Sequence, residues 1–387
     1  MKKLLPILLM ALLLLGGCGD EPQDKWQSVT VPAIHQSFAA PDAEYVLRDA
    51  WEYGEDALLL QYRLEPQEAE WENWLALYST RHDAVLATHP LGSGEVMRVV
   101  DETVIIEEER QVYSVQLEKG RVSFSDRVPL PDFLYEEVEL NGDIYGVTNS
   151  DVSADLTQLL YVSALQGLNI YDLQTGENRL LFAPGATPFH HDTDFDWLTT
   201  PAYLSFLPGD EQIVFYDMFT FDNPDCGIWL CDLAGAREWF IPMDVVGDLW
   251  NGGWQAHDDA PIPCIRTDYR EGSRGSFIAM ADLKTQTLSE WRYLSERPEI
   301  WPAAYNEKCF AYIVEHPDDD SIWAQEVFVV DIETLNQTSV LYAEYGDITV
   351  QAITEDGRVL FSWEGGYDAW QLGAAVTRAC GITDAIF

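Results

Sequence analysis

The sequence predicts an all-β fold, a β-propeller of seven blades with about four antiparallel strands each. Three observations lead to this prediction: strand-length apolar runs are joined by tight turns, one turn phrase recurs along the chain, and its period is that of a propeller blade. Six and eight blades are alternative counts. A single blade cannot bury both faces of its sheet, so it must stack on its neighbours.

The clearest single blade lies around Asp172. Leu159–Ser163 and Leu168–Leu173 are runs of apolar, aromatic and β-branched residues of strand length, and Asn178–Phe182 resumes the same chemistry. In the turn between the last two runs, Asp172 is expected to accept a hydrogen bond from the backbone N–H two residues on. Gly176 is expected to adopt the positive φ that closes the turn. The segment therefore predicts three antiparallel strands.

This turn sequence, which begins with an aspartate, recurs at Asp232, Asp282 and Asp331, each time after a short apolar run. Starting from Asp172, the steps between successive aspartates are 60, 50 and 49 residues. A period of about 40–50 residues with several strands in each unit is typical of propeller blades.

Taken in chain order, the strand-like runs give seven blades. We expect them to cover Ala57–Arg63 with Trp74–Thr88, Glu95–Val128, Ile144–Phe182, Ala202–Pro242, Pro263–Leu294, Ala303–Tyr342, and a last stretch from Ile348 to near Val376. The propeller domain as a whole is expected to span residues 45–387. Residues 26–31 are a candidate strand that helps to close the ring.

Two segments, each a turn followed by a strand, resemble repeats of a known family. Phe206–Phe215 and Glu355–Phe361 resemble the repeats of TolB-like propellers, and the similarity to TolB-like and WD40-like propellers covers most of residues 45–376. The resemblance implies the propeller fold. It implies no single activity, because propellers host binding, scaffolding and several unrelated chemistries.

The N-terminus resembles a bacterial lipoprotein signal peptide. Met1–Gly17 combines two lysines with an apolar run that is short for a transmembrane helix. Leu15–Cys18 resembles a lipobox, which implies cleavage before Cys18 and diacylglyceryl modification of its thiol. An ordinary signal peptide with a chance cysteine is the alternative. We expect residues 18–44 to carry the lipidated cysteine and a tether, which places the protein on the extracytoplasmic face of the cell membrane.

The charge of the chain is strongly negative. Removing residues 1–17 takes away two lysines and no acidic residue, so the formal net charge changes from −44 to −46. Nucleic acid and anionic membrane surfaces would repel such a protein, which excludes them as natural partners. Cations and basic polymers remain as partners, and adaptation of the whole proteome to salt or low pH explains the charge equally well.

The cysteines do not indicate a zinc site. No Cys-x-x-Cys pair occurs, and the number left after Cys18 is odd. We expect mainly buried thiols at the five remaining positions, which are Cys226, Cys231, Cys264, Cys309 and Cys380.

One insertion, between the third and fourth predicted blades, offers ligands for a cation. Asp192, Asp194 and Asp196 alternate along it, and calcium prefers oxygen ligands of this kind. The pattern departs from an EF-hand loop, because Trp197 stands where that loop has glycine. His191 could add to this site, or His190 and His191 could join His257 in a transition-metal site. A solvated acidic loop is the alternative, and no other cofactor is predicted.

Aromatic residues mark a second candidate site. Trp250 and Trp254 lie close to amide and carboxylate groups, and indole rings of this kind can stack on a sugar or a peptide. Together with Trp197 they are the candidate ligand-binding residues, with packing between blades as the alternative. The acidic runs Glu107–Glu109 and Asp318–Asp320 are expected to be turns or solvated faces.

Two functions follow from these observations. The first is a monomeric binding or scaffold module for an envelope protein, peptide or glycan, favoured because no phosphate-binding loop, nucleotide fingerprint, HExxH or GxSxG motif occurs and no catalytic residue is assigned. The alternative is a propeller hydrolase or lyase. In that case His190, His191 and His257, with nearby carboxylates, would hold a metal or act as acid and base.

Overall fold

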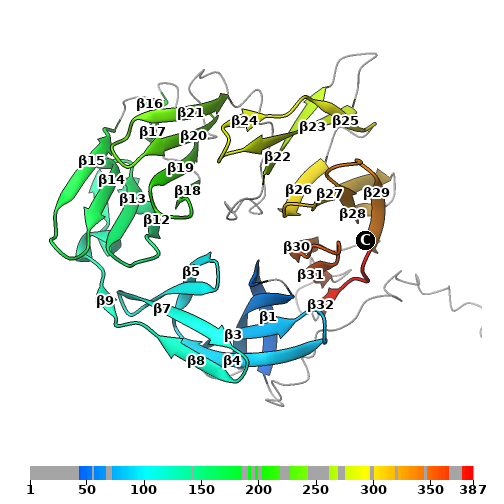
Figure 1. The fold of residues 1–387 in the computed structure, drawn as a ribbon, viewed down its shortest axis with the longest axis horizontal. Helices are drawn as coiled ribbons and strands as arrows, with labels where there is room; N and C mark the ends of the chain where they lie inside the picture. The colour runs from blue at the N-terminus through cyan, green and yellow to red at the C-terminus, as the bar shows by residue number, and fades with distance from the viewer. Residues whose placement is uncertain are drawn as a thin grey trace, which may run out of the picture.

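Seven small antiparallel sheets form a ring, so the chain is a seven-bladed β-propeller (Figure 1). The computed structural model describes residues 43–54, 56–66, 72–140, 143–184, 191–192, 197–198, 203–217, 227–242, 261–268, 275–296, 300–318, 321–343, 347–365 and 377–386. The predicted fold class and blade number are confirmed. The first strands of successive blades lie side by side near the centre of the ring, for example β5 (Glu95–Val100) with β12 (Val147–Val152).

The first four blades are built from consecutive strands of the chain. Blade 1 holds β1 (Ala43–Glu52), β2 (Ala57–Pro66), β3 (Glu72–Ser79) and β4 (Ala84–Gly92). Blade 2 holds β5, β6 (Thr103–Glu108), β7 (Gln111–Glu118) and β8 (Arg121–Phe124), with β9 (Val128–Pro129) also on β7. Blade 3 holds β12, β13 (Gln158–Ser163), β14 (Gly167–Asp172) and β15 (Asn178–Phe182). Blade 4 holds β18 (Tyr203–Phe206), β19 (Gln212–Asp217), β20 (Gly227–Asp232) and β21 (Arg237–Pro242).

The last three blades follow the same plan. Blade 5 holds β22 (Ile262–Asp268), β23 (Gly275–Asp282), β24 (Thr287–Leu288) and β25 (Arg292–Ser295). Blade 6 holds β26 (Ile300–Tyr305), β27 (Cys309–Asp318), β28 (Ser321–Asp331) and β29 (Gln337–Ala343). Blade 7 holds β30 (Asp347–Ile353), β31 (Val359–Gly365) and β32 (Thr377–Ile382).

Two predicted blade boundaries were wrong. The first blade begins at Ala43 rather than Ala57, because β1 pairs with β2 along nearly its whole length. The last blade does not end near Val376, because β32 follows and pairs with β31. The charged residues of β1 interrupt the apolar pattern by which the other strands are recognised. The candidate closing strand at 26–31 lies outside the described residues.

The recurring aspartate turn adopts the predicted geometry. In blade 3, Oδ1 of Asp172 accepts hydrogen bonds from the backbone N–H groups of Gln174 and Thr175, at 2.9 and 2.7 Å, and Gly176 has φ +75°. These bonds favour the carboxylate, so they hold the pKa of Asp172 below its ordinary value. Asp282 and Asp331 accept equivalent bonds and have lowered pKa values too.

The same aspartate turn shows which strands of blade 5 correspond to those of the other blades. Asp172, Asp232 and Asp331 end the third strands of blades 3, 4 and 6, and Asp282 ends β23. By this alignment β23 is a third strand, β22 is a second strand, and β24 and β25 together form the fourth, since both pair with β23. The described residues of blade 5 therefore hold its second, third and fourth strands.

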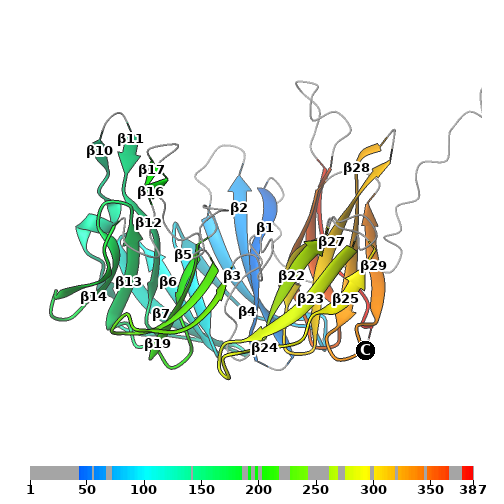
Figure 2. The same ribbon diagram turned by 90° about the horizontal axis from the view of Figure 1, so that it is seen from above.

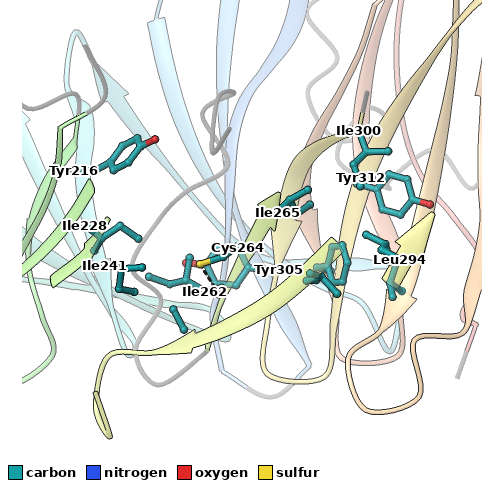
Figure 3. Packing of buried hydrophobic residues seen from close by; sticks show 14 of the residues in the cluster. Tyr216, Ile228, Ile241, Ile262, Cys264, Ile265, Leu294, Ile300, Tyr305 and Tyr312 are labelled. Atoms are coloured by element: carbon teal, nitrogen blue, oxygen red, sulfur yellow. Dashed lines mark hydrogen bonds between the residues drawn. The ribbon is translucent and has the colours of Figure 1, made fainter. Parts of the chain in front are cut away.

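The hydrophobic core lies between blades. Figure 3 shows one cluster in which Ile228 of blade 4, Ile265 of blade 5 and Tyr312 of blade 6 are packed with their neighbours. Another cluster joins blades 3 and 4, where the ring of Trp229 stacks on Phe215 with a centroid distance of 5.8 Å. Each fully buried large apolar side chain stabilises the fold by about 1.5–3 kcal/mol, so the flanks of the blades hold the ring together.

The three described cysteine side chains are buried thiols. Cys231, Cys264 and Cys309 are free and buried, as predicted. Burial raises the pKa of each thiol to about 12, which keeps it protonated and unreactive at neutral pH. Cys226 and the side chain of Cys380 lie outside the described residues. Within the described strands and turns, we find no helix with the length and apolarity needed to cross a bilayer.

Blades 7 and 1 close the ring by side-chain packing and a few polar contacts. Leu360 and Ile382 of blade 7 pack with Leu60 of blade 1 in one buried cluster. Arg358 Nη1 donates to the carbonyl oxygen of Thr80 at 2.6 Å. Every strand described in blade 7 comes from the C-terminal part of the chain, so the closing seam in the described residues depends on these contacts.

One buried amide links three blades at this seam. Asn306, which is 3% exposed, follows the first strand of blade 6, and its Nδ2 donates to the carbonyl of Ile353 in blade 7 and to Oε1 of Glu52 in blade 1. Burial raises the pKa of Glu52 to about 7; the Asn306 bond and Lys308 oppose this shift, whereas Glu355 and Glu307 add to it. Burial also raises the pKa of Asp49, on the same strand, to about 6.

Replacing Glu52 by glutamine is expected to make the protein less sensitive to alkaline conditions. A carboxyl whose pKa is raised in the folded state holds its proton more tightly there than in the unfolded chain. Its stabilising contribution is therefore complete below about pH 4.5 and is lost as the pH rises through 7. Glu52→Gln removes the buried charge and keeps an oxygen for Asn306. The free energy of unfolding at pH 8 should rise by about 1–3 kcal/mol, with little change near pH 4.5.

Urea unfolding at the two pH values measures this effect. Glu177→Gln, at an exposed turn position of blade 3, is the control and should change neither curve. A Glu52→Gln protein that loses the same stability at pH 8 and at pH 4.5 would contradict the assignment.

Candidate functional site

The two faces of the ring carry different connections. The antiparallel order places the connections between second and third strands, and those between successive blades, on one face. We call it the insertion face and define it by residues 109–110, 131–140, 143–146, 183–184, 191–192 and 197–198. The opposite turn face is defined by residues 153–157, 173–177 and 207–211. Figure 2 shows the hairpins β10 (Val138–Leu140) with β11 (Asp143–Tyr145), and β16 (His191–Asp192) with β17 (Trp197–Leu198), along the insertion face.

The structure describes only part of the candidate site residues. His191 and Asp192 form β16, and Asp192 pairs with Trp197 of β17, while nothing is described of these three side chains. The remaining candidates lie outside the described residues: His190, Asp194, Asp196, Trp250, Trp254 and His257. Among the described residues, no three histidine, cysteine, aspartate or glutamate side chains are grouped to hold a metal. The cation site and the aromatic site therefore stay predictions.

A pocket of about 310 Å³ opens on the insertion face between blades 2 and 3. Glu107 lines it from β6, and Tyr135 lines it from the short 3₁₀ helix η1 (Asp132–Tyr135). The full lining set is Glu107, Leu134, Tyr135, Val147, Thr148, Asn149 and Ser150.

A β-bulge explains how four consecutive residues of β12 reach this pocket. In a regular strand, successive side chains point to opposite faces of the sheet, so only alternate residues could line one cavity. The pairing of β12 with β13 shifts between Val147 and Asn149, which leaves Thr148 as the extra residue. Such bulges redirect side chains and often lie beside functional sites.

The innermost strands of blades 1, 2, 6 and 7 carry a corresponding shift in their pairing with the second strand. The bulge is therefore a repeated feature of the ring. Between blades 2 and 3, the bulge at Thr148 lines the described pocket.

Aromatic packing holds η1 in place above blade 3. The ring of Phe133 lies 4.8 Å from Tyr161 and 5.4 Å from Tyr171, measured between centroids. The Arg110 guanidinium lies 4.8 Å from the centre of the Tyr135 ring and pairs with Asp132 at 3.4 Å. These contacts of Asp132, Phe133 and Tyr135 hold the helix in place, so the Tyr135 hydroxyl has a defined position at the pocket.

The polar contacts of the pocket are those of a hydrogen-bonding site. The Tyr135 hydroxyl donates to Oε1 of Glu107. Burial, followed by the nearby carboxylate, raises the pKa of Tyr135 well above its ordinary value, so the phenol stays a neutral donor at physiological pH. The Thr148 hydroxyl donates to the Val162 carbonyl at 3.4 Å. The lining combines one carboxylate with uncharged donors and acceptors and the apolar Leu134 and Val147.

The prediction for the acidic run Glu107–Glu109, a turn or a solvated face, holds for one of its residues. Glu109 is exposed in a turn, whereas Glu107 and Glu108 are half-buried strand residues. Glu109 and Arg110 form the tight turn between β6 and β7, each with a positive φ, of +52° and +61°. Neither is a glycine or an asparagine, the residues that usually form such a turn.

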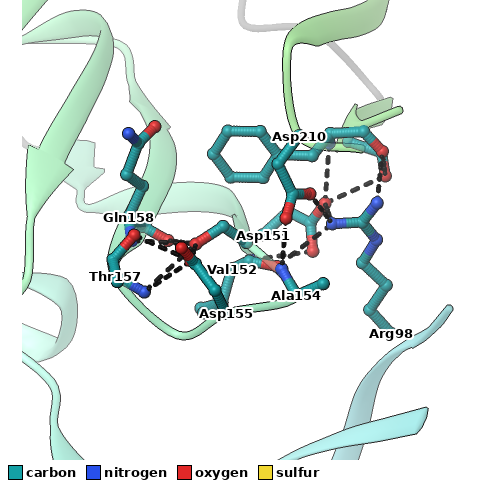
Figure 4. Close-up of polar contacts among 11 residues, drawn as sticks. Arg98, Asp151, Val152, Ala154, Asp155, Thr157, Gln158 and Asp210 are labelled. Atoms are coloured by element: carbon teal, nitrogen blue, oxygen red, sulfur yellow. Dashed lines mark hydrogen bonds and ion pairs between the residues drawn. The ribbon is translucent and has the colours of Figure 1, made fainter. Parts of the chain in front are cut away.

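A buried ionic network lies at the turn face, across blades 2, 3 and 4 (Figure 4). Arg98 of β5, 9% exposed, donates to the carbonyls of Val152 and Phe206 and to Oδ1 of Asp210, at 3.2, 2.9 and 3.0 Å. It also lies 3.8 Å from Asp151.

Asp151 is buried at the centre of this network. Its Oδ2 accepts from the Ser205 hydroxyl and the Phe206 N–H, at 2.9 and 2.8 Å. Burial raises the pKa of Asp151, while Arg98 and these donors oppose the rise. The network is enclosed by protein and connects three blades, so its role is to fix their arrangement.

Comparisons with known proteins find only distant structural similarity. No family model matches the chain, and no curated protein matches it. An oligogalacturonate lyase from Vibrio parahaemolyticus aligns with 89% of this chain and 91% of its own, at 12% identity and a TM-score of 0.48. An oligogalacturonate lyase in complex with manganese aligns with 89% of this chain and 98% of its own, at 13% identity and a TM-score of 0.44.

The β-propeller domain of the Trilobed protease from Pyrococcus furiosus aligns with 87% of this chain and 93% of its own. The identity is 10% and the TM-score is 0.43. At these identities and scores no activity or ligand carries over to this chain. What the structure establishes is a seven-bladed β-propeller with its long connections and a polar pocket on one face.

Proposed function

We propose that the protein is a lipid-anchored, extracytoplasmic binding propeller whose insertion face engages a protein, peptide or glycan of the cell envelope. The observation that supports it most is the asymmetry of the two faces. The hairpins β10–β11 and β16–β17 and the polar pocket all belong to one face, and the short aspartate turns belong to the other. Loops carried on a rigid scaffold are where binding residues concentrate.

The anchor and the charge support the location. Cys18 is the residue that would carry the diacylglyceryl group, and two acyl chains suffice for stable anchoring. The 24 residues 19–42 between Cys18 and the first strand would act as the tether. A flexible chain of that length has an end-to-end distance of about 25–30 Å. The net charge of −46 after cleavage would keep the ring away from an anionic bilayer, with its binding face free.

A propeller lyase or hydrolase is the alternative function. It depends on His190, His191 and His257, whose side chains lie outside the described residues. The described pocket offers hydrogen-bonding groups, which favours binding as the first proposal. Metal bound stoichiometrically to the purified protein, detected by mass spectrometry, would favour the enzyme instead.

Photo-crosslinking in bacterial cells that produce the full-length protein tests the proposal. A photoreactive phenylalanine analogue replaces Ile144 of β11, which is 67% exposed on the insertion face, or Gln174, which is exposed on the turn face. We expect a crosslinked envelope component from position 144 and none from position 174. In the same cells, Cys18→Ala should release the protein from the membrane fraction.

Crosslinks from position 174 alone, or an equal pattern from both positions, would contradict a binding role for the insertion face. A Cys18→Ala protein that stays in the membrane fraction would contradict the lipid anchor.

A further inference from the structure

We propose that the pocket between blades 2 and 3 binds a neutral saccharide unit, such as one residue of an uncharged envelope glycan. This inference rests on the proposed binding function and assigns a ligand class and a position to it. Three properties of the pocket carry it: its size, its polar groups and the sign of its charge.

The volume fits a single sugar ring. At about 310 Å³ the cavity lies at the lower end of the range for small-molecule pockets, about 300–1,000 Å³. The residues that line it come from two blades and from η1, so the cavity has walls on several sides. A compact ring fits it better than an extended peptide side chain of flexible shape.

The lining groups match a molecule rich in hydroxyl groups. Glu107 supplies a carboxylate acceptor, and Tyr135, Thr148 and Ser150 supply hydroxyl groups that both donate and accept. Asn149 adds an amide with both functions. Leu134 and Val147 provide an apolar contact for the C–H surface of a sugar ring. A carbohydrate presents this same mixture of hydrogen-bonding edges and apolar faces.

The charge of the pocket argues against an anionic ligand. None of the seven lining residues is cationic, and one is a carboxylate. The Arg110 guanidinium lies over the Tyr135 ring and pairs with Asp132. A uronate or a phosphate would therefore meet negative charge without a partner, in a protein that is already strongly acidic.

The same lining makes an amine the weaker match. An ammonium group needs acceptors only, because it has three donors and no acceptor. Oε1 of Glu107 accepts from the Tyr135 hydroxyl, and the other polar lining groups each offer a donor as well as an acceptor. The hydroxyl groups of a sugar can pair with both the donors and the acceptors of the pocket. An ammonium group can pair only with the acceptors and would leave the donors of the pocket without a partner.

The geometry of the pocket is set before any ligand arrives. The bulge at Thr148 presents four residues in a row, and the packing of Phe133 against Tyr161 and Tyr171 fixes η1. Preorganisation of this kind reduces the entropy lost on binding, so even a small ligand can be held.

Titration of the full-length, detergent-solubilised protein with simple probes tests the inference. The probes are glucose, galactose and N-acetylglucosamine as neutral saccharides, galacturonic acid as an anionic one, and putrescine as an amine. Saturation-transfer NMR and calorimetry are expected to detect saturable binding of at least one neutral saccharide and weaker or no binding of the other two classes. Glu107→Gln and Tyr135→Phe should each weaken that binding at least tenfold, since the first removes the charged acceptor and the second removes a hydroxyl that lines the pocket and pairs with Glu107.

Glu137→Gln, at an exposed position of the same connection, is the matched control and should leave binding unchanged. Circular dichroism melting curves show whether each variant is folded. Binding of galacturonic acid or putrescine in preference, no saccharide binding, or saccharide binding that Glu107→Gln leaves intact would overturn the inference. If crosslinks from position 144 persist while no saccharide binds, the ligand class fails and the proposed function stands.

Discussion

Replacing Arg98 by methionine is expected to lower the free energy of unfolding by about 3–5 kcal/mol. The guanidinium makes four contacts with blades 3 and 4 from its position in blade 2, and Asp151 beside it is almost fully buried. Methionine fills a similar volume but leaves the Asp151 charge without a cation and removes the guanidinium donors from the carbonyls of Val152 and Phe206. Breaking a buried pair from one side is costly because the remaining charge stays desolvated.

Chemical unfolding monitored by tryptophan fluorescence measures the loss. Arg81→Met is the control, because Arg81 pairs with Asp56 at 3.6 Å on the exposed surface, where such pairs contribute about 0–1 kcal/mol. The double variant Arg98→Met with Asp151→Asn should recover part of the loss, since it removes the unpaired charge. A loss below about 1 kcal/mol for Arg98→Met would mean that the network does not hold the three blades together.

Gly167→Ala is expected to destabilise the protein by about 3 kcal/mol or more, the range of the most damaging single substitutions. Gly167 begins β14 with φ +77°, a conformation that costs a residue with a side chain about 1–2 kcal/mol. A Cβ built there would lie 2.0 Å from the carbonyl oxygen of Phe182, on the paired strand β15. Since that atom is backbone, the overlap can be relieved only by moving β15 away from β14.

Gly120→Ala separates the two causes. Gly120 has nearly the same φ, +72°, and a Cβ there would meet no atom within 4 Å. The alanine at 120 should therefore cost only the backbone strain, about 1 kcal/mol. Equal losses in melting experiments on the two variants would show that the contact with Phe182 does not limit residue 167.

The blades could be predicted from sequence because their determinants are local. Asp172 and Gly176 form a turn whose hydrogen bonds lie within a few residues, and the flanking apolar runs bury both faces of a strand. The same applies at Asp232, Asp282 and Asp331. Wherever the signal stays within one hairpin, the residue pattern and the observed strand agree.

The first strand could not be predicted in the same way. In β1 the charged residues Arg48, Asp49 and Glu52 interrupt the apolar pattern. Glu52 is accommodated by Asn306, which is 254 residues away in the sequence. Only closure of the ring brings the two together, so nothing near β1 in the sequence could indicate the contact.

The pocket was missed for a related reason. Glu107 and Tyr135 come from different structural elements, and the run Glu107–Glu109 resembles a solvated face when it is considered alone. The bulge at Thr148 is a property of strand register and has no glycine to mark it. The size, charge and orientation of the pocket depend on how blades 2 and 3 pack against each other, and this packing is not visible in the sequence of either blade.

We propose that ligand binding takes place on the insertion face, between blades 2 and 3. Hydrogen–deuterium exchange on the full-length protein, with and without a saturating neutral saccharide, shows where the ligand binds. We expect slower exchange in β6, η1 and β12 and unchanged exchange in the turn-face segments 153–157 and 207–211. Protection centred on the turn-face segments, or none in β6, η1 and β12, would contradict it.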